Sequence, residues 1–425
     1  MEQSTLETRL LSGELDGELT TLYGAERLED ARSRCAAVLS GFAKTFACLP
    51  EALFSAPGRT ELGGNHTDHQ HGRVLAAAVN LDILAAAAPN QSGMIRVQSE
   101  GYPLIVVDLK ELTPKQGEEN TSAALIRGVA ARMAALGCPL QDAGLDAYIV
   151  SNVPGGSGLS SSAAFEVLIG TMLNALFWNG KSSAVEIAQI GQYAENVFFG
   201  KPCGLMDQTA SAVGGMVTID FFEKDHPVIE SVDFDFASCG HALCIIDSRA
   251  SHADLTDEYA AITQELKAVC AHFGKDVLTQ IDPADFYAAI PALRESCGDR
   301  AVLRAMHFYN ENARVPQQVA ALQAGDFAAF LELVKASGAS SYMYLQNVIP
   351  AGYKEHQEVA VTIAAAKHFL NGAGAVRVHG GGFAGTVQAF VPLEKLDAFK
   401  AEMEAILGAG KCHILSIRPE GGAVL

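Results

Sequence analysis

Apolar positions recur along the chain with two different periods, which predicts both helices and strands. Helical spacing is clearest over 165–177, where apolar residues form one stripe that stops before Gly180. Further helices are expected over the segments 26–47, 123–136, 257–273, 283–297, 301–311, 316–323, 327–336 and 356–370. Strands are expected over 98–109, 145–151, 216–222, 375–379 and 386–391, and as a pair with a turn near Asn80 over 75–88.

The chain is long for a single hydrophobic core. It has 425 residues, of which 49% are hydrophobic and 19% charged, and this is the composition of a globular protein. Two domains are therefore expected. The charged, proline-containing stretch 223–227 is the predicted boundary, which gives an N-terminal domain of residues 1–222 and a C-terminal domain of residues 223–425.

The charge pattern limits the partners. A net charge of −19 without a run of Lys or Arg argues against nucleic acid or an acidic membrane surface as a partner. The nine cysteines contain no C-x-x-C pair, which fits the reduced thiols of a cytoplasmic protein. The polar N-terminus is unlike a signal peptide, and the apolar stretch 74–88 is too short and too polar to span a bilayer.

A glycine- and serine-rich run, Pro-Gly-Gly-Ser-Gly-Leu-Ser-Ser-Ser-Ala-Ala, fills 154–164 between a predicted strand and a predicted helix. Glycines let the backbone approach a ligand closely, and the free N–H groups of a helix N-terminus attract anions. A flexible turn capped by serine is the simpler interpretation, but the strand–loop–helix context favours phosphate binding. No lysine follows the run, so it is not a Walker A loop.

A second glycine cluster, 380–385, contains a literal G-x-G-x-x-G. A dinucleotide-binding loop must open a helix, because the helix N-terminus holds the pyrophosphate. Here the alternating residues 386–391 predict a strand instead, which argues against a dinucleotide site. A plain turn between two strands is the remaining alternative to a functional loop.

A polar segment, 59–72, lies between two apolar stretches and is too polar for a core strand. Its closely spaced His66, Asp68, His69 and His71 invite a zinc interpretation. Zinc ligands must converge with an ordered second shell, which one contiguous loop rarely provides. A polar turn and a polar binding site are the two alternatives that remain.

Two acidic residues stand out further along the chain. Asp207 follows a helix, where an Asp usually bonds its own backbone, but it is also a candidate base. Glu195 ends a helix that begins near Ser183, whose spacing to Glu186 predicts a capping box. Glu195 borders the apolar face of that helix, so it is either a surface side chain or a carboxylate that is paired or bound to a metal.

Together these segments resemble the galactokinases of the GHMP small-molecule kinase superfamily. The phosphate loop matches the pattern P-x-G-x-G-L-[GS]-S-S-A-[AS], residues 203–208 match the segment whose Asp faces the reacting sugar hydroxyl, and 380–385 resembles the third motif. The resemblance covers about residues 45–395, with a sugar-binding segment at about 45–80. It implies an α+β, two-domain GHMP kinase fold with the active site in the interdomain cleft.

The resemblance also implies an activity: ATP- and Mg²⁺-dependent phosphorylation of the anomeric hydroxyl of a sugar, with galactose to galactose 1-phosphate the first expectation. It makes Asp207 the catalytic base and Arg59 the cation that keeps Asp207 ionised and stabilises the transferring phosphoryl group. The protein is expected to act as a monomer or a weak homo-oligomer.

The resemblance assigns binding roles as well. The residues expected at the ATP phosphates are Gly155, Gly156, Ser157, Gly158, Leu159, Ser160, Ser161 and Ser162. Those expected at the sugar are Asn65, His66, Asp68, Gly204, Asp207 and Tyr259. Ser162 and Glu195 are expected to hold Mg²⁺.

Four departures from the family pattern G-R-x-N-L-I-G-E-H-T-D-Y gather near the sugar: Glu61, Gly63, Asn65 and His69 replace Asn, Ile, Glu and Tyr. In the family the Glu at the place of Asn65 binds a sugar hydroxyl. We therefore expect Asn65 to change sugar choice and Gly63 to leave room for a larger substituent, unless Glu61 swings in to replace the carboxylate. Three alternatives to galactose stay open: an amino sugar, a uronic acid or arabinose. A non-catalytic sugar sensor is disfavoured by the retained Arg59 and Asp207.

Overall fold

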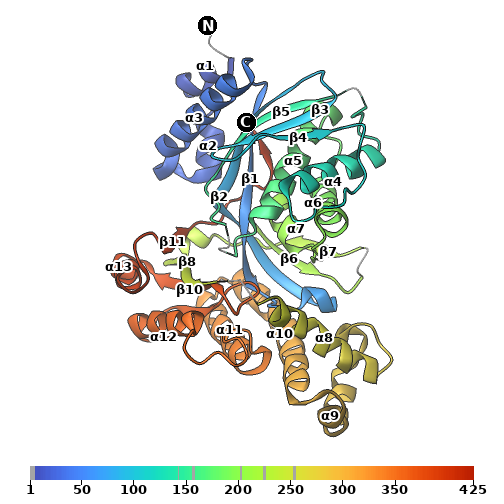
Figure 1. Ribbon diagram of the computed structural model, residues 1–425. Helices are drawn as coiled ribbons and strands as arrows, with labels where there is room; N and C mark the ends of the chain where they lie inside the picture. The colour runs from blue at the N-terminus through green and yellow to red at the C-terminus, as the bar shows by residue number, and fades with distance from the viewer. Residues whose placement is uncertain (1–4, 142, 156–157, 202, 224–225, 252–254) are drawn as a thin grey trace.

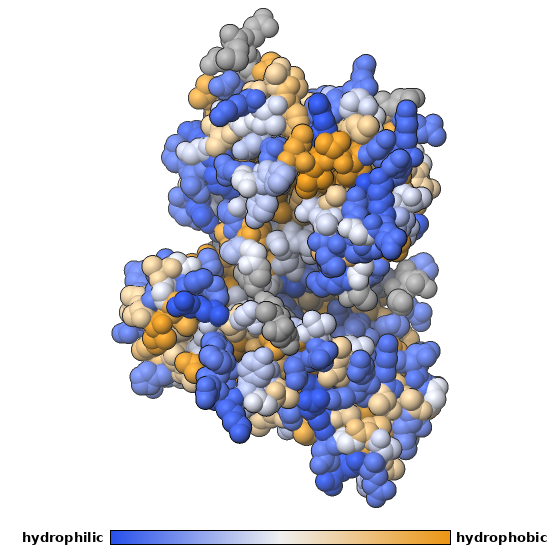
Figure 2. All heavy atoms as spheres, in the orientation of Figure 1, coloured by the Kyte–Doolittle hydropathy of each residue, from blue (hydrophilic) through white to orange (hydrophobic). Residues whose placement is uncertain are grey.

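The computed structural model describes residues 5–141, 143–155, 158–201, 203–223, 226–251 and 255–425. The chain forms two halves, each with its own sheet and helices, stacked one above the other in Figure 1. Figure 2 shows the surface narrowing where the halves meet, with mainly polar side chains over both. The predicted mixture of helices and strands is confirmed.

Within the described residues, eight strands form the sheet of the upper half. The central path runs β12–β1–β2–β5–β3–β4, and the hairpin of β6 and β7 attaches to β2. All neighbours are antiparallel except β3 and β5, which are parallel. The strands are β1 Ala52–Gly63, β2 Arg73–Pro89, β3 Met94–Ser99, β4 Ile105–Asp108, β5 Leu145–Ser151, β6 Met216–Asp220, β7 Val228–Ser231 and β12 Ala423–Val424.

Helices cover this sheet, and one of them forms the centre of the core. The helices are α1 Thr5–Ser12, α2 Asp16–Tyr23, α3 Leu28–Phe46, α4 Ser122–Ala135, α5 Ser161–Trp178, α6 Ala184–Ala194 and α7 Met206–Val213. Among the described helices, α5 is the one long and apolar enough to cross a membrane by length and composition, and 61% of it is buried inside the protein. Such burial is what a core helix shows.

The lower half contains a four-stranded antiparallel sheet in the order β11–β8–β10–β9. Its strands are β8 His241–Ala250, β9 Ala375–Val378, β10 Gly385–Pro392 and β11 Cys412–Leu415. Its helices are α8 Thr256–His272, α9 Pro283–Cys297, α10 Asp299–Gln323, α11 Phe327–Ser340, α12 Glu358–Leu370 and α13 Leu396–Leu407. Short helical turns complete the fold: η1 Ala25–Arg27, η2 Asp68–Gln70, η3 Glu195–Phe199, η4 Phe236–Ser238, η5 Leu278–Gln280, η6 Ser341–Leu345 and η7 Leu393–Lys395.

The end of the chain returns to the upper half. β12 pairs with β1, with Phe54 opposite Val424, and the C-terminus lies beside the upper sheet in Figure 1. β7 also belongs to that sheet through its pairing with β6. Two strands that follow residue 222 are thus hydrogen-bonded to the first sheet, so the predicted boundary between 222 and 223 does not separate the two sheets.

A buried polar cluster centred on Asp82 joins the N-terminal helices, β1, β2 and the C-terminal segment. Its carboxylate accepts hydrogen bonds from the Tyr23 hydroxyl and the Ser55 hydroxyl, each at 2.5 Å, and from Arg34 at 2.7 Å. The guanidinium of Arg418, fully buried like Asp82, lies 3.4 Å away. Burial alone would raise the pKa of Asp82, but the two guanidinium groups and the hydroxyl hydrogen bonds hold it below its usual range.

The segment 75–88 differs from the prediction, because it lies within one continuous strand, β2, instead of two strands with a turn. Asn80 is buried inside this strand. Its N–H donates to the Ser416 carbonyl and its Oδ1 accepts from the Ser416 N–H, both at 3.1 Å. A partner more than 300 residues away in sequence therefore satisfies the polar group that suggested a turn.

Two further predictions of element extent were wrong. The segment 98–109 contains the end of β3 and the whole of β4 instead of one strand, because the chain turns at Gly101, whose φ is +78°. The segments 301–311 and 316–323 belong to a single helix, α10, which contains Pro316. The remaining predicted elements are present, with ends shifted by a few residues.

Candidate active site

The first pair in the site is Arg59 and Asp207. Arg59 extends from β1 and is almost fully buried, while Asp207 lies in the first turn of α7. Arg59 Nε donates to Asp207 Oδ1 at 2.7 Å, and a second guanidinium nitrogen donates to the carbonyl of Gly158. The prediction that residues 59–63 are too polar for a core strand was wrong, because partners from distant segments pair these side chains.

Both carboxylate oxygens of Asp207 are engaged. The Ser160 hydroxyl donates to Oδ2 at 2.5 Å, opposite the bond from Arg59. Burial alone would raise the pKa of Asp207, but the charge of Arg59 and the hydrogen bonds from Arg59 and Ser160 lower it below its usual range. Asp207 is therefore ionised at neutral pH, and its side chain keeps 32% of its surface exposed for a ligand.

The phosphate loop leads into the N-terminus of α5. Gly156 and Ser157 lie outside the described residues. Ser160 is the N-cap residue with φ of +55°, but its hydroxyl bonds Asp207 and does not cap the helix. The first turn of α5 therefore has no side-chain cap, which leaves its N–H groups for an anion.

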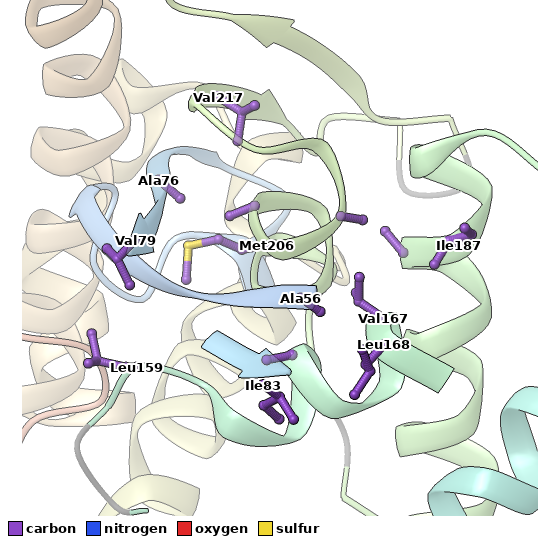
Figure 3. Packing of buried hydrophobic residues seen from close by; sticks show 14 of the residues in the cluster. Ala56, Ala76, Val79, Ile83, Leu159, Val167, Leu168, Ile187, Met206 and Val217 are labelled. Atoms are coloured by element: carbon purple, nitrogen blue, oxygen red, sulfur yellow. The ribbon is translucent and has the colours of Figure 1, made fainter. Parts of the chain in front are cut away.

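Leu159 anchors the same loop to the core. Its side chain is fully buried, and Figure 3 shows it among the apolar side chains that include Val79 and Ile83. Its carbonyl accepts a hydrogen bond from the Arg59 N–H at 3.0 Å. Leu159 is thus a packing residue, and its backbone is hydrogen-bonded to the strand that carries Arg59.

The second glycine cluster connects β9 to β10, so a strand follows it, as predicted. Gly158 of the phosphate loop packs against the residues that flank this cluster. A Cβ on Gly158 would lie 3.1 Å from both His379 Nδ1 and Thr386 Oγ1, and its φ of +70° also favours glycine. Gly158 and the residues that flank the second glycine cluster, which are far apart in sequence, therefore meet at the junction of the two halves.

Four of the predicted sugar-binding residues also gather at this junction: His66, Asp68, Gly204 and Tyr259. His66 Nε2 lies 2.9 Å from the carbonyl of Gly381, and the Tyr259 hydroxyl donates to the carbonyl of Gly382 at 2.7 Å. Asp68 packs so closely on Gly204 that a Cβ on Gly204 would overlap its carboxylate. A side chain at position 204 would therefore have to displace the carboxylate of Asp68.

Asn65, by contrast, is fully buried in a polar network. Its Nδ2 donates to the Gly380 carbonyl at 2.7 Å and to Glu61 at 3.1 Å. Its Oδ1 accepts from Asn347 at 3.0 Å and from Ser341 at 3.3 Å. Because both ends of the amide are bonded within the protein, the structure argues against a direct contact between Asn65 and the sugar.

Glu61 and Gly63, which also depart from the family pattern, contact other parts of the protein as well. Glu61 is buried and ion-paired with the fully buried Arg377, so it is not free to swing toward a ligand. A Cβ on Gly63 would overlap the side chain of Gln318, which fills the space beside it. The expectations that Gly63 leaves room for a larger substituent and that Glu61 replaces a missing carboxylate both disagree with this packing.

We predict that Asn65→Glu destabilises the protein and does not improve the use of galactose. The new carboxylate would be buried beside Glu61, and an uncompensated buried charge costs about 3–5 kcal/mol. The free energy of unfolding, measured in urea, is compared with that of Gln317→Glu, which makes the same charge change on the exposed side of α10. Unchanged stability together with a higher kcat/KM for galactose would contradict this prediction.

The histidine-rich turn is not a metal site in this structure. Across the described residues, His, Cys, Asp and Glu side chains form no group of three that could hold a metal ion. Burial lowers the pKa of His69 to about 4, so its imidazole is neutral, which is the form that binds metals. The positions of the side chains, and not their protonation, therefore argue against the zinc interpretation.

Ser162 and Glu195 meet beside the N-terminus of α5. The Ser162 hydroxyl donates to Glu195 Oε1 at 3.3 Å, and Lys201 Nζ lies 3.5 Å from the same oxygen. Glu195 is buried at the point where α6 passes into η3, as predicted for the end of that helix. A hydroxyl and a carboxylate beside a phosphate site are oxygen donors of the kind that Mg²⁺ takes, so these residues fit the predicted metal.

Sequence reasoning missed the groups behind this pair. Glu166 and Gln208 are fully buried, and the amide of Gln208 bridges Glu166 and Glu195. Burial, followed by the charge of Glu195, raises the pKa of Glu166 well above its usual range. The sequence signals for this cluster were a Glu on the apolar stripe of α5 and the place of Gln208 in the matching segment 203–208, and neither indicates the partner of the other.

This arrangement of a glycine-rich loop, an uncapped helix N-terminus and an Arg–Asp pair defines a small-molecule kinase of the GHMP class. A family model for the GHMP kinases N terminal domain matches residues 124–215, and one for the galactokinase galactose-binding signature matches residues 40–89. The chain belongs to the galactokinase family, as the relatives below establish.

Two curated relatives, both named galactokinase, show this. That of Streptomyces coelicolor is 32% identical over 87% of this chain and 92% of its own length. That of Glaesserella parasuis is 32% identical over 84% of this chain and 90% of its own length. Among solved structures, Lactococcus lactis galactokinase complexed with galactose aligns with a TM-score of 0.77 and 26% identity, over 92% of this chain and all of that one. L. major mevalonate kinase shares the fold, with a TM-score of 0.60, 16% identity and coverage of 88% and 99%.

Proposed function

We propose that this protein transfers the γ-phosphoryl group of ATP to the anomeric hydroxyl of galactose. The observation that carries the proposal is the bonding of Asp207 to both Arg59 and Ser160, at the N-terminus of α5. Gly204 precedes the helix that carries Asp207, and Asp68 lies against Gly204. This placement suits a sugar that is held next to the carboxylate of Asp207. The galactokinase relatives and the galactose-bound Lactococcus lactis structure support galactose as that sugar.

The chain's own groups would hold the phosphates and the metal. The N–H groups in the first turn of α5 and the glycines of the loop bind phosphate oxygens, and Ser162 and Glu195 bind Mg²⁺. Mg²⁺, when bound, would neutralise charge on the phosphates. Lys201, close to Glu195, adds a positive charge on the same side of the site.

Asp207 positions the acceptor hydroxyl and takes its proton. The new bond forms between the sugar oxygen and the γ-phosphorus, the bond from that phosphorus to the ADP oxygen breaks, and the hydroxyl proton goes to Asp207. Since the pKa of Asp207 is lowered, Asp207 is a weak base and takes the hydroxyl proton only as the new bond to phosphorus forms. Arg59 keeps Asp207 ionised and places a fixed positive charge near the transferring group.

One observation favours a second candidate, a kinase for another sugar. Position 65 has an amide where the family pattern has a Glu, so no carboxylate is offered to the ligand there. The amide of Asn65 is also bonded within the protein and does not take the place of that carboxylate. A sugar with a different substituent on that side then loses less binding affinity from the missing carboxylate than galactose does. The intact Arg59–Asp207 pair continues to argue against a sensor without catalytic activity.

The proposal also covers the cellular compartment and the oligomeric state of the protein. All nine cysteines are free, which suits the cytoplasm, where thiols stay reduced. We propose that it acts there as a monomer or a weak homo-oligomer, without nucleic acid or membrane partners.

The substrate is tested by an ADP-release assay with a panel of sugars. The panel contains galactose, galactosamine, N-acetylgalactosamine, galacturonate, arabinose and glucose, each compared by kcat/KM. The proposal predicts that galactose has the highest value. A higher value for another member would assign the protein to that sugar, and ADP release that no sugar stimulates would contradict a sugar kinase.

We predict that Glu195→Gln raises the Mg²⁺ concentration needed for half-maximal activity by about tenfold or more. Mg²⁺ prefers a charged carboxylate oxygen, and Gln offers only a neutral amide oxygen. The measurement is a Mg²⁺ titration of initial rates at saturating ATP and sugar. Glu186→Gln, at the exposed start of α6, is the matched control, and an unchanged Mg²⁺ requirement in Glu195→Gln would remove Glu195 from the metal site.

A further inference from the structure

A buried row of three polar side chains lies behind the Ser162–Glu195 pair. Glu166 extends from α5, Gln208 from α7 and Glu195 from the end of α6, and each is at most 2% exposed. Gln208 Nε2 donates to Glu166 Oε2 at 2.9 Å and to Glu195 Oε2 at 2.8 Å. An amide nitrogen carries two hydrogens, so Gln208 holds one carboxyl group with each.

This row fixes the direction of the Glu195 carboxylate. Oε2 is bound from behind by Gln208, while Oε1 faces the Ser162 hydroxyl and Lys201. Turning the carboxylate would break the bond to Gln208 in a place where water does not reach, and an unpaired buried polar group is costly. The oxygen that faces the site is therefore selected by the buried partners of the other oxygen.

The packing around the row limits its movement. Gly191 of α6 lies directly against it: a Cβ there would come within 3.1 Å of Glu166 Oε2 and 3.2 Å of Gln208 Cγ. The absence of a side chain at 191 lets α6 approach α5 and α7 closely enough for the amide of Gln208 to span both carboxyl groups. Three helices thus share one hydrogen-bonded unit.

We propose that Glu166 is a positioning residue for the divalent-cation site and acts on Glu195 through Gln208. This inference rests on the proposed function, because the cation site is part of it. Glu166 itself does not face the cation, and its contribution is the hydrogen-bond acceptor that orients Gln208. Partners of this kind behind a metal ligand typically change metal affinity by 10- to 100-fold.

The test compares two substitutions at one position. Glu166→Gln keeps an oxygen that accepts the bond from Gln208, whereas Glu166→Met has a similar length and no strong acceptor. Mn²⁺ binding in the presence of ADP is measured by electron paramagnetic resonance, and metal-free thermal unfolding checks that each variant folds. We expect Glu166→Gln to bind Mn²⁺ within about threefold of the wild type and Glu166→Met to bind it about 10- to 100-fold more weakly.

A second variant tests the same connection in case Glu166→Met does not fold. Gln208→Met breaks the same connection from its middle member and is expected to weaken Mn²⁺ binding as Glu166→Met does. Wild-type affinity in either folded Met variant overturns the inference, as does equal weakening in Glu166→Gln and Glu166→Met. If wild-type protein and Glu195→Gln bind Mn²⁺ alike, the cation site itself fails, and the inference falls with it.

Discussion

Asp207→Asn is expected to lower kcat by about 10²–10⁴-fold, the range typical for loss of a positioned proton acceptor. Asn has the size of Asp, but it cannot accept the proton of the sugar hydroxyl, and it ends the ion pair with Arg59. ATP affinity should change little, because the phosphate-binding N–H groups belong to α5. The measurements are steady-state kcat and the equilibrium affinity for ATP.

The matched control for this variant is Asp220→Asn. It breaks another Arg–Asp pair of 2.7 Å, between Arg73 and Asp220, outside the site. That variant should keep wild-type kcat. A near wild-type kcat for Asp207→Asn would end the assignment of Asp207 as the proton acceptor, and an equal loss in both variants would point to a general structural effect.

Asp82→Asn is expected to lower the free energy of unfolding by about 3–5 kcal/mol, the usual cost of removing one partner of a buried ion pair. Without the carboxylate, the fully buried Arg418 loses its buried counter-charge. Tyr23 and Arg34 would lose the group that joins α2 and α3 to the sheet. The measurement is urea unfolding at neutral pH, read by circular dichroism.

The same carboxylate gives stability a pH dependence of known sign. Because the folded-state pKa of Asp82 is lowered, its contribution is present above the unfolded Asp pKa of about 3.9 and is lost as pH falls through the folded value. Asp82→Asn should therefore lose less stability than the wild type over that acidic range.

Asp16→Asn removes a partly exposed ion pair with Arg32 and is the control, because water screens such a pair and its loss should change the free energy of unfolding far less. Equal costs for Asp82→Asn and Asp16→Asn would contradict the role given to the buried cluster.

Local signals made much of the fold predictable. The capping box of Ser183 and Glu186 forms as predicted, with the Ser183 N–H donating to Glu186 at 2.7 Å. The helix over 283–297 has the predicted limits, since Asp282 caps it and Pro283 begins it. The strand that follows 380–385 was also predictable, because residues 386–391 alternate in polarity over a few positions.

Distant partners explain what could not be predicted. Arg59 and Glu61 looked too polar for a strand, because their partners Asp207 and Arg377 are 148 and 316 residues away. Asn65 was expected at the sugar because the resembling family has a sugar-binding Glu at that place, whereas its actual partners, Ser341 and Asn347, are 276 and 282 residues away. A single sequence gives the kind of polar group at a position, but its partner is decided by the tertiary fold.

The candidate site also contains some features that the sequence predicts and others that it does not. The loop and the pair of Ser162 and Glu195 follow from glycine content, helix ends and the family resemblance. The bond from Ser160 to Asp207 does not, because a serine at a helix start is expected to cap that helix. The support of Glu195 by Glu166 also stayed hidden, since a buried Glu inside an apolar stripe has no visible partner in sequence.

Phosphorylation of the anomeric hydroxyl of galactose is tested by identifying the product. The protein is incubated with ATP, Mg²⁺ and galactose labelled with ¹³C at C1, and the mixture is followed by ³¹P and ¹³C NMR. We expect a new phosphate resonance that is coupled to the labelled carbon, forms in step with ADP and is absent with Asp207→Asn. Phosphate at another sugar position, or inorganic phosphate in place of a sugar phosphate, would contradict it.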